Sequence, residues 1–129
     1  MNGSYVLDTN IVIAVFDQEA VVLERIVAAE RILVPIPAIG ELFHGTLRSR
    51  RSADNVQKIE RLAQAHKITP IDLETARHYG AIKGDLRRKG KPIPENDIWI
   101  AAIARQHNAT VATRDQHFDA IESVAVEHW

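Results

Sequence analysis

Near the N-terminus the sequence reads Tyr5-Val6-Leu7-Asp8-Thr9-Asn10. Three apolar residues in a row predict a short strand that is buried on both faces of a sheet. The polar residues that follow are typical of helix N-caps, and a further apolar segment starts at Ile11. This segment therefore predicts a strand that passes directly into a helix, with a carboxylate at the junction.

The same alternation of short apolar runs and longer helical patterns continues along the chain. Strands are predicted at Tyr5-Val6-Leu7, Ile32-Leu33-Val34, 68–71, Thr110-Val111-Ala112 and Val124-Ala125-Val126. Helices are predicted from Pro37 onward, at 56–63, at 73–86 with Asp72 as the N-cap, and at 97–107 with Asn108 as the stop. This order indicates an α/β fold with a central parallel sheet, and a length of 129 residues indicates one domain, 1–129.

The composition excludes several kinds of site. The 16 basic and 17 acidic residues nearly cancel, so any binding of nucleic acid must depend on local basic patches. The chain has no cysteine, which excludes disulfides and thiolate metal sites. We find no long hydrophobic stretch and no basic leader after Met1, and we therefore expect a cytoplasmic protein that does not contact a membrane.

Four acidic residues are predicted at the sheet edge where open α/β proteins bind their ligands. Asp8 follows the first strand, Glu41 lies in the helix after the second, Asp97 starts a helix, and Asp115 follows the fourth strand. Each also has a simpler explanation: Asp8 and Asp97 as helix N-caps, Asp115 as a solvated turn residue, and Glu41 as an exposed helix position. Their common edge favours a functional cluster, because independent caps need not converge.

A cluster of four carboxylates requires a positive charge, because the carboxylates would otherwise repel one another and some would stay protonated. Oxygen ligands without cysteine suit Mg²⁺ or Mn²⁺. The six histidines do not have the spacing of a zinc site, and surface or helix-face positions are expected for most of them. The sequence therefore predicts a magnesium centre, in which Mn²⁺ could substitute.

Four segments resemble the motifs of PIN-domain ribonucleases. They are Val6-Leu7-Asp8-Thr9-Asn10, Ile39-Gly40-Glu41-Leu42, Asn96-Asp97-Ile98-Trp99-Ile100-Ala101-Ala102 and Thr113-Arg114-Asp115-Gln116-His117-Phe118. They occur in the family's order and at its usual spacings, over nearly the whole chain. The resemblance implies a three-layer α/β/α fold with a mostly parallel sheet.

Within that family, the short length and the segment Lys89-Gly90-Lys91-Pro92-Ile93-Pro94 resemble VapC-type toxins of bacterial toxin–antitoxin pairs. This resemblance implies a homodimer, inhibition by a VapB-type antitoxin, and cleavage of structured RNA such as a tRNA or ribosomal RNA loop. Two alternatives stay open: a housekeeping RNA-processing nuclease without an antitoxin, and a non-catalytic nucleic-acid-binding or regulatory module. The complete set of four acids argues against the second. An aspartate-nucleophile phosphatase fits poorly, because its signature requires an Asp where this chain has Asn10.

Our hypothesis for the reaction is metal-assisted hydrolysis of a phosphodiester bond. Asp8 and Asp97 would be the principal ligands of Mg²⁺, and Asp115 would complete that site or help to bind a second ion. Glu41 would ligate through water or orient the attacking water, and Thr113 would hydrogen-bond a liganding carboxylate. Attack by water predicts products with a 5′-phosphate and a 3′-hydroxyl.

Two basic clusters could hold the RNA backbone beside an acidic centre. One contains Arg48, Arg50 and Arg51, and the other contains Arg87, Arg88, Lys89 and Lys91. Favourable charges at helix ends explain them equally well. We favour the second cluster for RNA contacts, since it leads directly into the third acidic motif. Trp99 and Trp129 could stack on bases, although a core or interface position is expected for Trp99.

Overall fold

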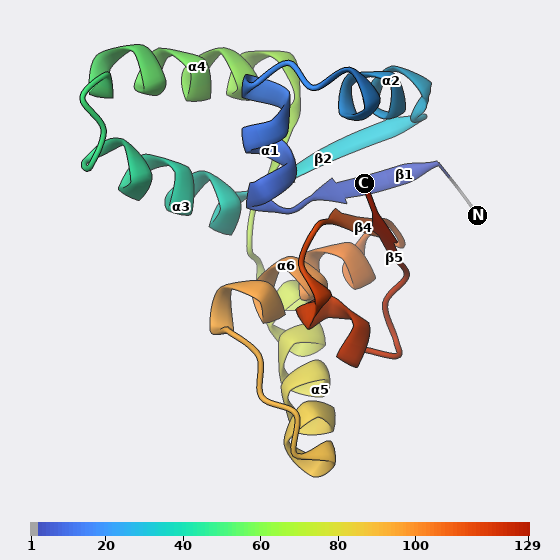
Figure 1. Ribbon diagram of the computed structural model, residues 1–129. Coiled ribbons are helices and arrows are strands. Elements are labelled where there is room, and N and C mark those ends of the chain that lie inside the picture. Colours follow the sequence, from blue (N-terminus) through green and yellow to red (C-terminus); the bar gives the residue numbers. More distant parts are fainter. Residues whose placement is uncertain (1–2) are drawn as a thin grey trace.

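The computed structural model describes residues 3–129, which form a five-stranded sheet covered by helices (Figure 1). The strands are β1 (Ser4–Leu7), β2 (Arg31–Pro35), β3 (Lys67–Thr69), β4 (Thr110–Thr113) and β5 (Val126–His128). The helices are α1 (Thr9–Phe16), α2 (Ala20–Ala28), α3 (Ile36–Thr46), α4 (Ser52–Ala65), α5 (Leu73–Lys89) and α6 (Glu95–Gln106), with a 3₁₀ helix η1 (Gln116–Ala120). The strand order is β3-β2-β1-β4-β5 and every pair is parallel, which confirms the predicted α/β fold.

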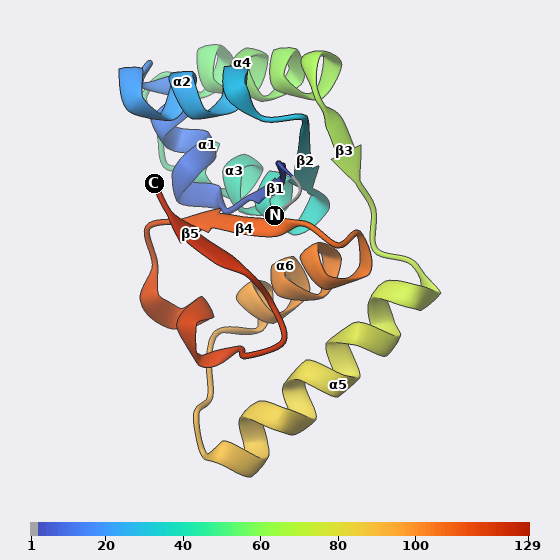
Figure 2. The same cartoon turned by 90° about the vertical axis from the view of Figure 1, so that its right-hand side faces the viewer.

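The sheet carries a separate apolar core on each face, because successive strand residues point to opposite sides. Figure 2 shows α5 and α6 on one side of the sheet and α1, α2 and α4 on the other. Helix α3 borders both cores, since Ala38 belongs to the first and Leu42 to the second. The strand residues of the first core are Val6, Leu33 and Val111, and those of the second are Leu7, Val34 and Ala112. The fold is therefore the expected three-layer α/β/α arrangement.

The order of the strands reverses at β1, and this position determines where a site can lie. From β1 the chain goes outward to β2 and β3, and it then returns to place β4 on the other side of β1. In open α/β sheets, ligands bind beyond the carboxyl ends of the strands at such a reversal. The backbone N–H of Asp8 donates to the carbonyl of Ala112 at 3.0 Å and keeps the two strand ends together.

Two predicted strands differ from the observed ones. The run at 68–71 is β3 over Lys67–Thr69, because Pro70 cannot continue the hydrogen-bond ladder. The run Val124-Ala125-Val126 lies mostly in a turn, and β5 starts at its last residue. Val124 is buried in the core from that turn, while the exposed edge strand contains the polar residues Glu127 and His128. A short apolar run can therefore be buried without forming a strand.

The predicted helices are present with shifted limits. Helix α6 begins two residues before Asp97, because Pro94 precedes its first turn, and it ends just before Asn108, whose φ is +53°. Asp72 caps α5 as predicted, by accepting from the N–H of Thr75 at 3.1 Å. Helices α4 and α5 extend beyond the predicted 56–63 and 73–86. None of the helices in residues 3–129 is long and apolar enough to cross a membrane.

Candidate active site

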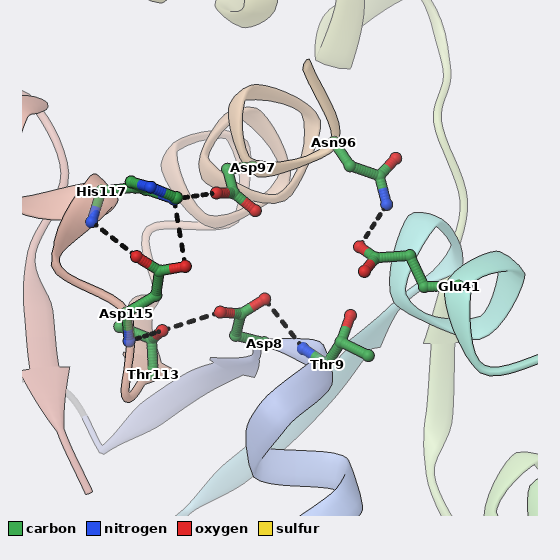
Figure 3. A network of polar contacts seen from close by, with 8 residues as sticks. All are labelled: Asp8, Thr9, Glu41, Asn96, Asp97, Thr113, Asp115 and His117. Atoms are coloured by element: carbon green, nitrogen blue, oxygen red, sulfur yellow. Dashed lines mark hydrogen bonds and ion pairs between the residues drawn. The ribbon is translucent and has the colours of Figure 1, made fainter. Parts of the chain in front are cut away.

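Asp8 lies at the junction of β1 and α1, where it is both a helix cap and a buried carboxylate (Figure 3). One carboxylate oxygen accepts from the N–H of Thr9 at 2.8 Å, and the other accepts from the hydroxyl of Thr113 at 2.7 Å. The side chain is almost fully buried, with 5% of the residue exposed. Burial, together with the nearby carboxylates of Asp97 and Glu41, raises the pKa of Asp8 to about 6 despite both hydrogen bonds.

The end of β4 brings a second carboxylate to Asp8 through one hydroxyl. Thr113 donates its hydroxyl hydrogen to Asp8 and accepts the N–H of Asp115 at 2.9 Å. Asp115 in turn caps η1 by accepting the backbone N–H of His117 at 2.9 Å. The side-chain oxygen of Asn10 accepts the N–H of Arg114 at 3.2 Å, which ties this turn to α1. Thr113 is thus a direct link between two of the acids.

Asp97 approaches the same place from the first turn of α6, and His117 joins it to Asp115. The ring Nδ1 of His117 lies 2.9 Å from Asp97 Oδ2 and 3.0 Å from Asp115 Oδ2. The bond to Asp97 raises the pKa of His117. Burial raises the pKa of Asp97 more than the bond to His117 lowers it, and the nearby carboxylates of Asp115 and Glu41 add to the rise. The two aspartates therefore gain from a positive charge between them.

Glu41 reaches the cluster from the opposite side, on α3 (Figure 3). The residue is exposed, and its carboxylate accepts a hydrogen bond from the side-chain amide of Asn96. That amide also donates to the carbonyl of Pro37 at 3.2 Å, so Asn96 connects α6 to the first turn of α3. Glu41 contributes to the raised pKa of both Asp8 and Asp97, which means that its charge acts on both.

These donors fit a divalent cation at one position in particular. One ligand atom each from Asp97, Asp115 and His117 lies within 4.8 Å of the other two. Carboxylate oxygens suit Mg²⁺ and Mn²⁺, and an imidazole nitrogen is tolerated better by Mn²⁺ than by Mg²⁺. Asp8 is not a member of this group of three, although Thr113 links it to Asp115. The cluster therefore offers a set of oxygen and nitrogen donors that could hold a divalent cation.

The structure brings together all four acids and the threonine that the sequence singled out. Asp8 does cap a helix, yet the cap carboxylate also faces the other acids. Asp97 is not a cap, because Pro94 holds that position. Asp115 is half-buried and bonded instead of being a free turn residue.

Two residues of the cluster were not singled out by sequence. His117 has no zinc-type spacing, and the available signal was its position two residues after Asp115. Asn96 gave only the signal of a polar residue next to Asp97 at a helix start. Neither signal distinguishes a residue of the site from an ordinary surface residue. The role of His117 depends on its contact with α6, and the role of Asn96 depends on its contact with α3.

Comparison with known proteins agrees with this geometry. The family model for the PIN domain matches residues 5–124. The chain belongs to the PIN-domain family. This PIN domain is 33% identical over 128 residues to ribonuclease VapC2 of Haemophilus influenzae, with 97% of each chain covered. It is 27% identical over 128 residues to the tRNA(fMet)-specific endonuclease VapC of Shigella flexneri, again with 97% of each covered.

Solved structures give the same assignment. The PIN domain superposes on a chain of VapBC2 from Rickettsia felis, crystallised with a DNA fragment from their promoter, with a TM-score of 0.88. The two chains share 27% identity, and the match covers 98% of each. The family resemblance seen in the sequence motifs is therefore confirmed, and so is the α/β/α fold that it implied.

Proposed function

We propose that this PIN domain is a metal-dependent endoribonuclease that hydrolyses phosphodiester bonds of structured RNA and acts as the toxin of a toxin–antitoxin pair. One observation carries the proposal: carboxylates from β1, α3, α6 and the end of β4 face one another where the strand order reverses. Such a cluster is costly without a cation, and a cation among carboxylates binds phosphate oxygens. Ribonuclease relatives that match over nearly the whole chain support the choice of RNA.

In this proposal Asp8, Asp97 and Asp115 hold Mg²⁺, for which Mn²⁺ can substitute. The ion would supply Lewis acidity toward the phosphate oxygens. Thr113 fixes the direction of the Asp8 carboxylate with its hydroxyl, as it does at 2.7 Å here. Glu41 is the most exposed of the four acids and has room to orient a water molecule on the side that α3 faces. All four acids thus act in catalysis, three of them as ligands.

The reaction is a hydrolysis in which water is the nucleophile. The water oxygen forms a bond to phosphorus, its proton passes to a carboxylate, and the bond from phosphorus to the 3′ oxygen breaks. The 3′ oxygen leaves as a hydroxyl after it takes up a proton. The products carry a 5′-phosphate and a 3′-hydroxyl, and the 2′-hydroxyl of RNA serves recognition only.

The partners follow from the relatives. Structures of VapBC complexes, among them one from a toxin–antitoxin system of Mycobacterium tuberculosis, support a VapB-type antitoxin as the inhibitor. A relative named for tRNA(fMet) supports a tRNA target, with ribosomal RNA as the second choice. We further propose that residues 1–129 act as one domain in a cytoplasmic homodimer. An adjacent small gene for a DNA-binding antitoxin would favour the toxin over a housekeeping nuclease, and co-expression of that gene should suppress cleavage.

The decisive experiment is cleavage of a total RNA pool by the purified chain. Three reactions are compared: Mg²⁺, Mg²⁺ with excess EDTA, and Asp8→Asn with Mg²⁺. Defined cuts in the first reaction only, with new 5′ ends that carry phosphate, are the expected result. Products that end in a 2′,3′-cyclic phosphate contradict the water mechanism. No cutting by folded, antitoxin-free protein contradicts the nuclease and favours a binding module.

A further inference from the structure

A cavity of about 280 Å³ lies between the C-terminal part of α5, the connection that follows it and the start of α6. Figure 1 shows this connection running back along α5 before it enters α6. The floor of the cavity is apolar, with Leu86 and Ile98 buried and Ile93 half-buried. Its rim carries the cations Lys83, Arg87 and Lys91. An apolar floor under a cationic rim suits a ligand with a flat apolar part and a negative charge.

The cations of this region fall into two groups by their partners. Arg88 pairs with Asp85, Lys89 pairs with Asp85 and Glu122, and Lys83 donates to Glu95 at 3.0 Å. Within residues 3–129, Arg87 and Lys91 form no ion pair and no side-chain hydrogen bond, and both are exposed. Arg87 and Lys91, which have no partner among residues 3–129, therefore both line the cavity. Arg88 and Lys89 lie outside it.

The connection that forms one wall of the cavity is held in a fixed shape. Gly90 has a φ of +65°, which ends α5 and reverses the chain. The N–H of Lys91 donates to Leu86 at 3.0 Å, and the N–H of Gly90 donates to Arg87 at 3.1 Å, as in a Schellman motif. Pro92 and Pro94 then restrict the backbone up to α6. A ligand therefore meets a preformed cavity, which lowers the entropy cost of binding.

The cavity adjoins the candidate active site through one helical turn. Glu95 and Ile98 line the cavity, and Asp97 between them belongs to the acidic cluster. Glu95 does not repel an anion strongly here, because Lys83 and Tyr79 both donate to its carboxylate. The cavity and the acidic cluster therefore share the first turn of α6.

We infer that this cavity binds one nucleotide of single-stranded RNA next to the cleaved bond, with its base on Leu86, Ile93 and Ile98 and its phosphate between Arg87 and Lys91. The inference rests on the proposed nuclease function. A nucleotide is the ligand that combines a flat base with an anionic phosphate, and RNA loops present unstacked bases. Arg87 and Lys91 carry the contact, and Arg88 and Lys89 maintain the fold of the region.

The test is RNA binding by the full chain in the non-cleaving Asp8→Asn background, with a pool of short single-stranded RNA as the probe. Arg87→Gln with Lys91→Gln should weaken binding about tenfold or more, and should lower the salt slope by about 0.7, the value for one lost phosphate contact on a single strand. The matched control is Arg88→Gln with Lys89→Gln, which removes the same charge from the same segment. It should change both quantities much less. Equal losses in the two double variants overturn the inference, because only net charge would then matter.

A second variant tests the floor separately from the charges. Ile93→Ser should weaken RNA binding several-fold and leave the salt slope unchanged, while melting curves establish that every variant is folded. If the Arg87 and Lys91 variant binds RNA normally but fails to bind antitoxin or to self-associate, the cavity is a protein interface and the inference is wrong. Cleavage by the wild-type chain with Mg²⁺ is measured separately. Its absence contradicts the nuclease, whereas normal RNA binding by the cavity variants contradicts this inference alone.

Discussion

The two sides of the acidic cluster are built in different ways. Asp8 and Asp115 stand at the ends of adjacent parallel strands, and a single hydroxyl from Thr113 joins them. Glu41 stands in the middle of α3 and depends on one amide, that of Asn96, for its contact with the rest of the cluster. On the strand side Asp8 is buried, Asp115 is half-buried and the geometry follows from the sheet, while on the helix side Glu41 is exposed. We therefore expect the same chemical change to cost much more on the strand side.

The largest effect should come from Asp8→Asn. Loss of a metal ligand removes several kcal/mol of transition-state stabilisation, so cleavage should fall about a thousandfold or more. In the presence of chelator the same variant should melt at a higher temperature than wild type, because it removes a buried charge that other carboxylates repel. RNA cleavage rates and melting curves measure the two effects. Asp54→Asn, an exposed acid on α4, is the matched control and should change neither.

A smaller loss is expected from Thr113→Val, which removes one hydroxyl at nearly constant volume. Asp8 then loses a donor and the N–H of Asp115 loses its acceptor, so kcat should fall about 10- to 100-fold while the chain still folds. The control is Thr69→Val at the end of β3, since the buried hydroxyl of Thr69 has no hydrogen-bond partner in residues 3–129. That control should be as active and at least as stable as wild type. A fully active Thr113→Val variant would mean that the sheet alone orients Asp8.

On the helix side, Asn96→Ala should reduce cleavage about tenfold at most. The variant frees Glu41 without removing its charge, and the lost contact can be replaced by water. A double-mutant cycle with Glu41→Gln checks the cause, because two changes that act through one contact are not additive. Additive losses in kcat would show that Asn96 acts independently of Glu41. If Asn96→Ala lowered kcat as much as Thr113→Val does, the strand side and the helix side of the cluster would not differ in sensitivity.

The smallest effect concerns stability against pH in the metal-free protein. The pKa of Asp8 is raised to about 6 by burial, so the folded state keeps a proton that the unfolded state has lost. The contribution of Asp8 to the free energy of unfolding should be largest below about pH 4 and should fall by up to about 3 kcal/mol as the pH rises through about 6. Denaturant titrations in EDTA measure this decrease. Asp8→Asn should flatten the curve, and saturating Mn²⁺ should also reduce the slope for wild type.

The sequence predicted the fold and the acids well because both depend on local patterns. A buried parallel strand is a short apolar run whatever its neighbours are, and the residue after such a strand lies at a known edge of the sheet. Asp8 and Asp115 could therefore be placed from sequence. Glu41 was placed by the strand that precedes its helix, but a Glu in a helix is usually a surface residue, so its assignment to the cluster also depended on the convergence of the other acids and on the family motif.

What the sequence did not predict depends on contacts between distant segments. His117 bridges Asp97 and Asp115 only because η1 turns back over the start of α6. The basic segment before the third motif looked uniform, yet Asp85 and Glu122 pair with two of its cations, Arg88 and Lys89, and Arg87 and Lys91 have no ion-pair partner among residues 3–129. The strand at the C-terminal edge was placed two residues early, because Val124 is buried in a turn. Pairings of this kind cannot be read from spacing.

The direction of Asp97 is determined twice, once by Pro94 and once by the core. Pro94 sets where α6 begins, and the buried Ile98 and Ile100 set its rotation about its own axis. Each residue of a helix turns the next by about 100°. One residue inserted between Asp97 and Ile98 would put these two constraints out of phase, and Asp97 would no longer face His117. Insertions before Pro94 leave the phase intact, so natural length variation in this connection should be confined to residues before that proline.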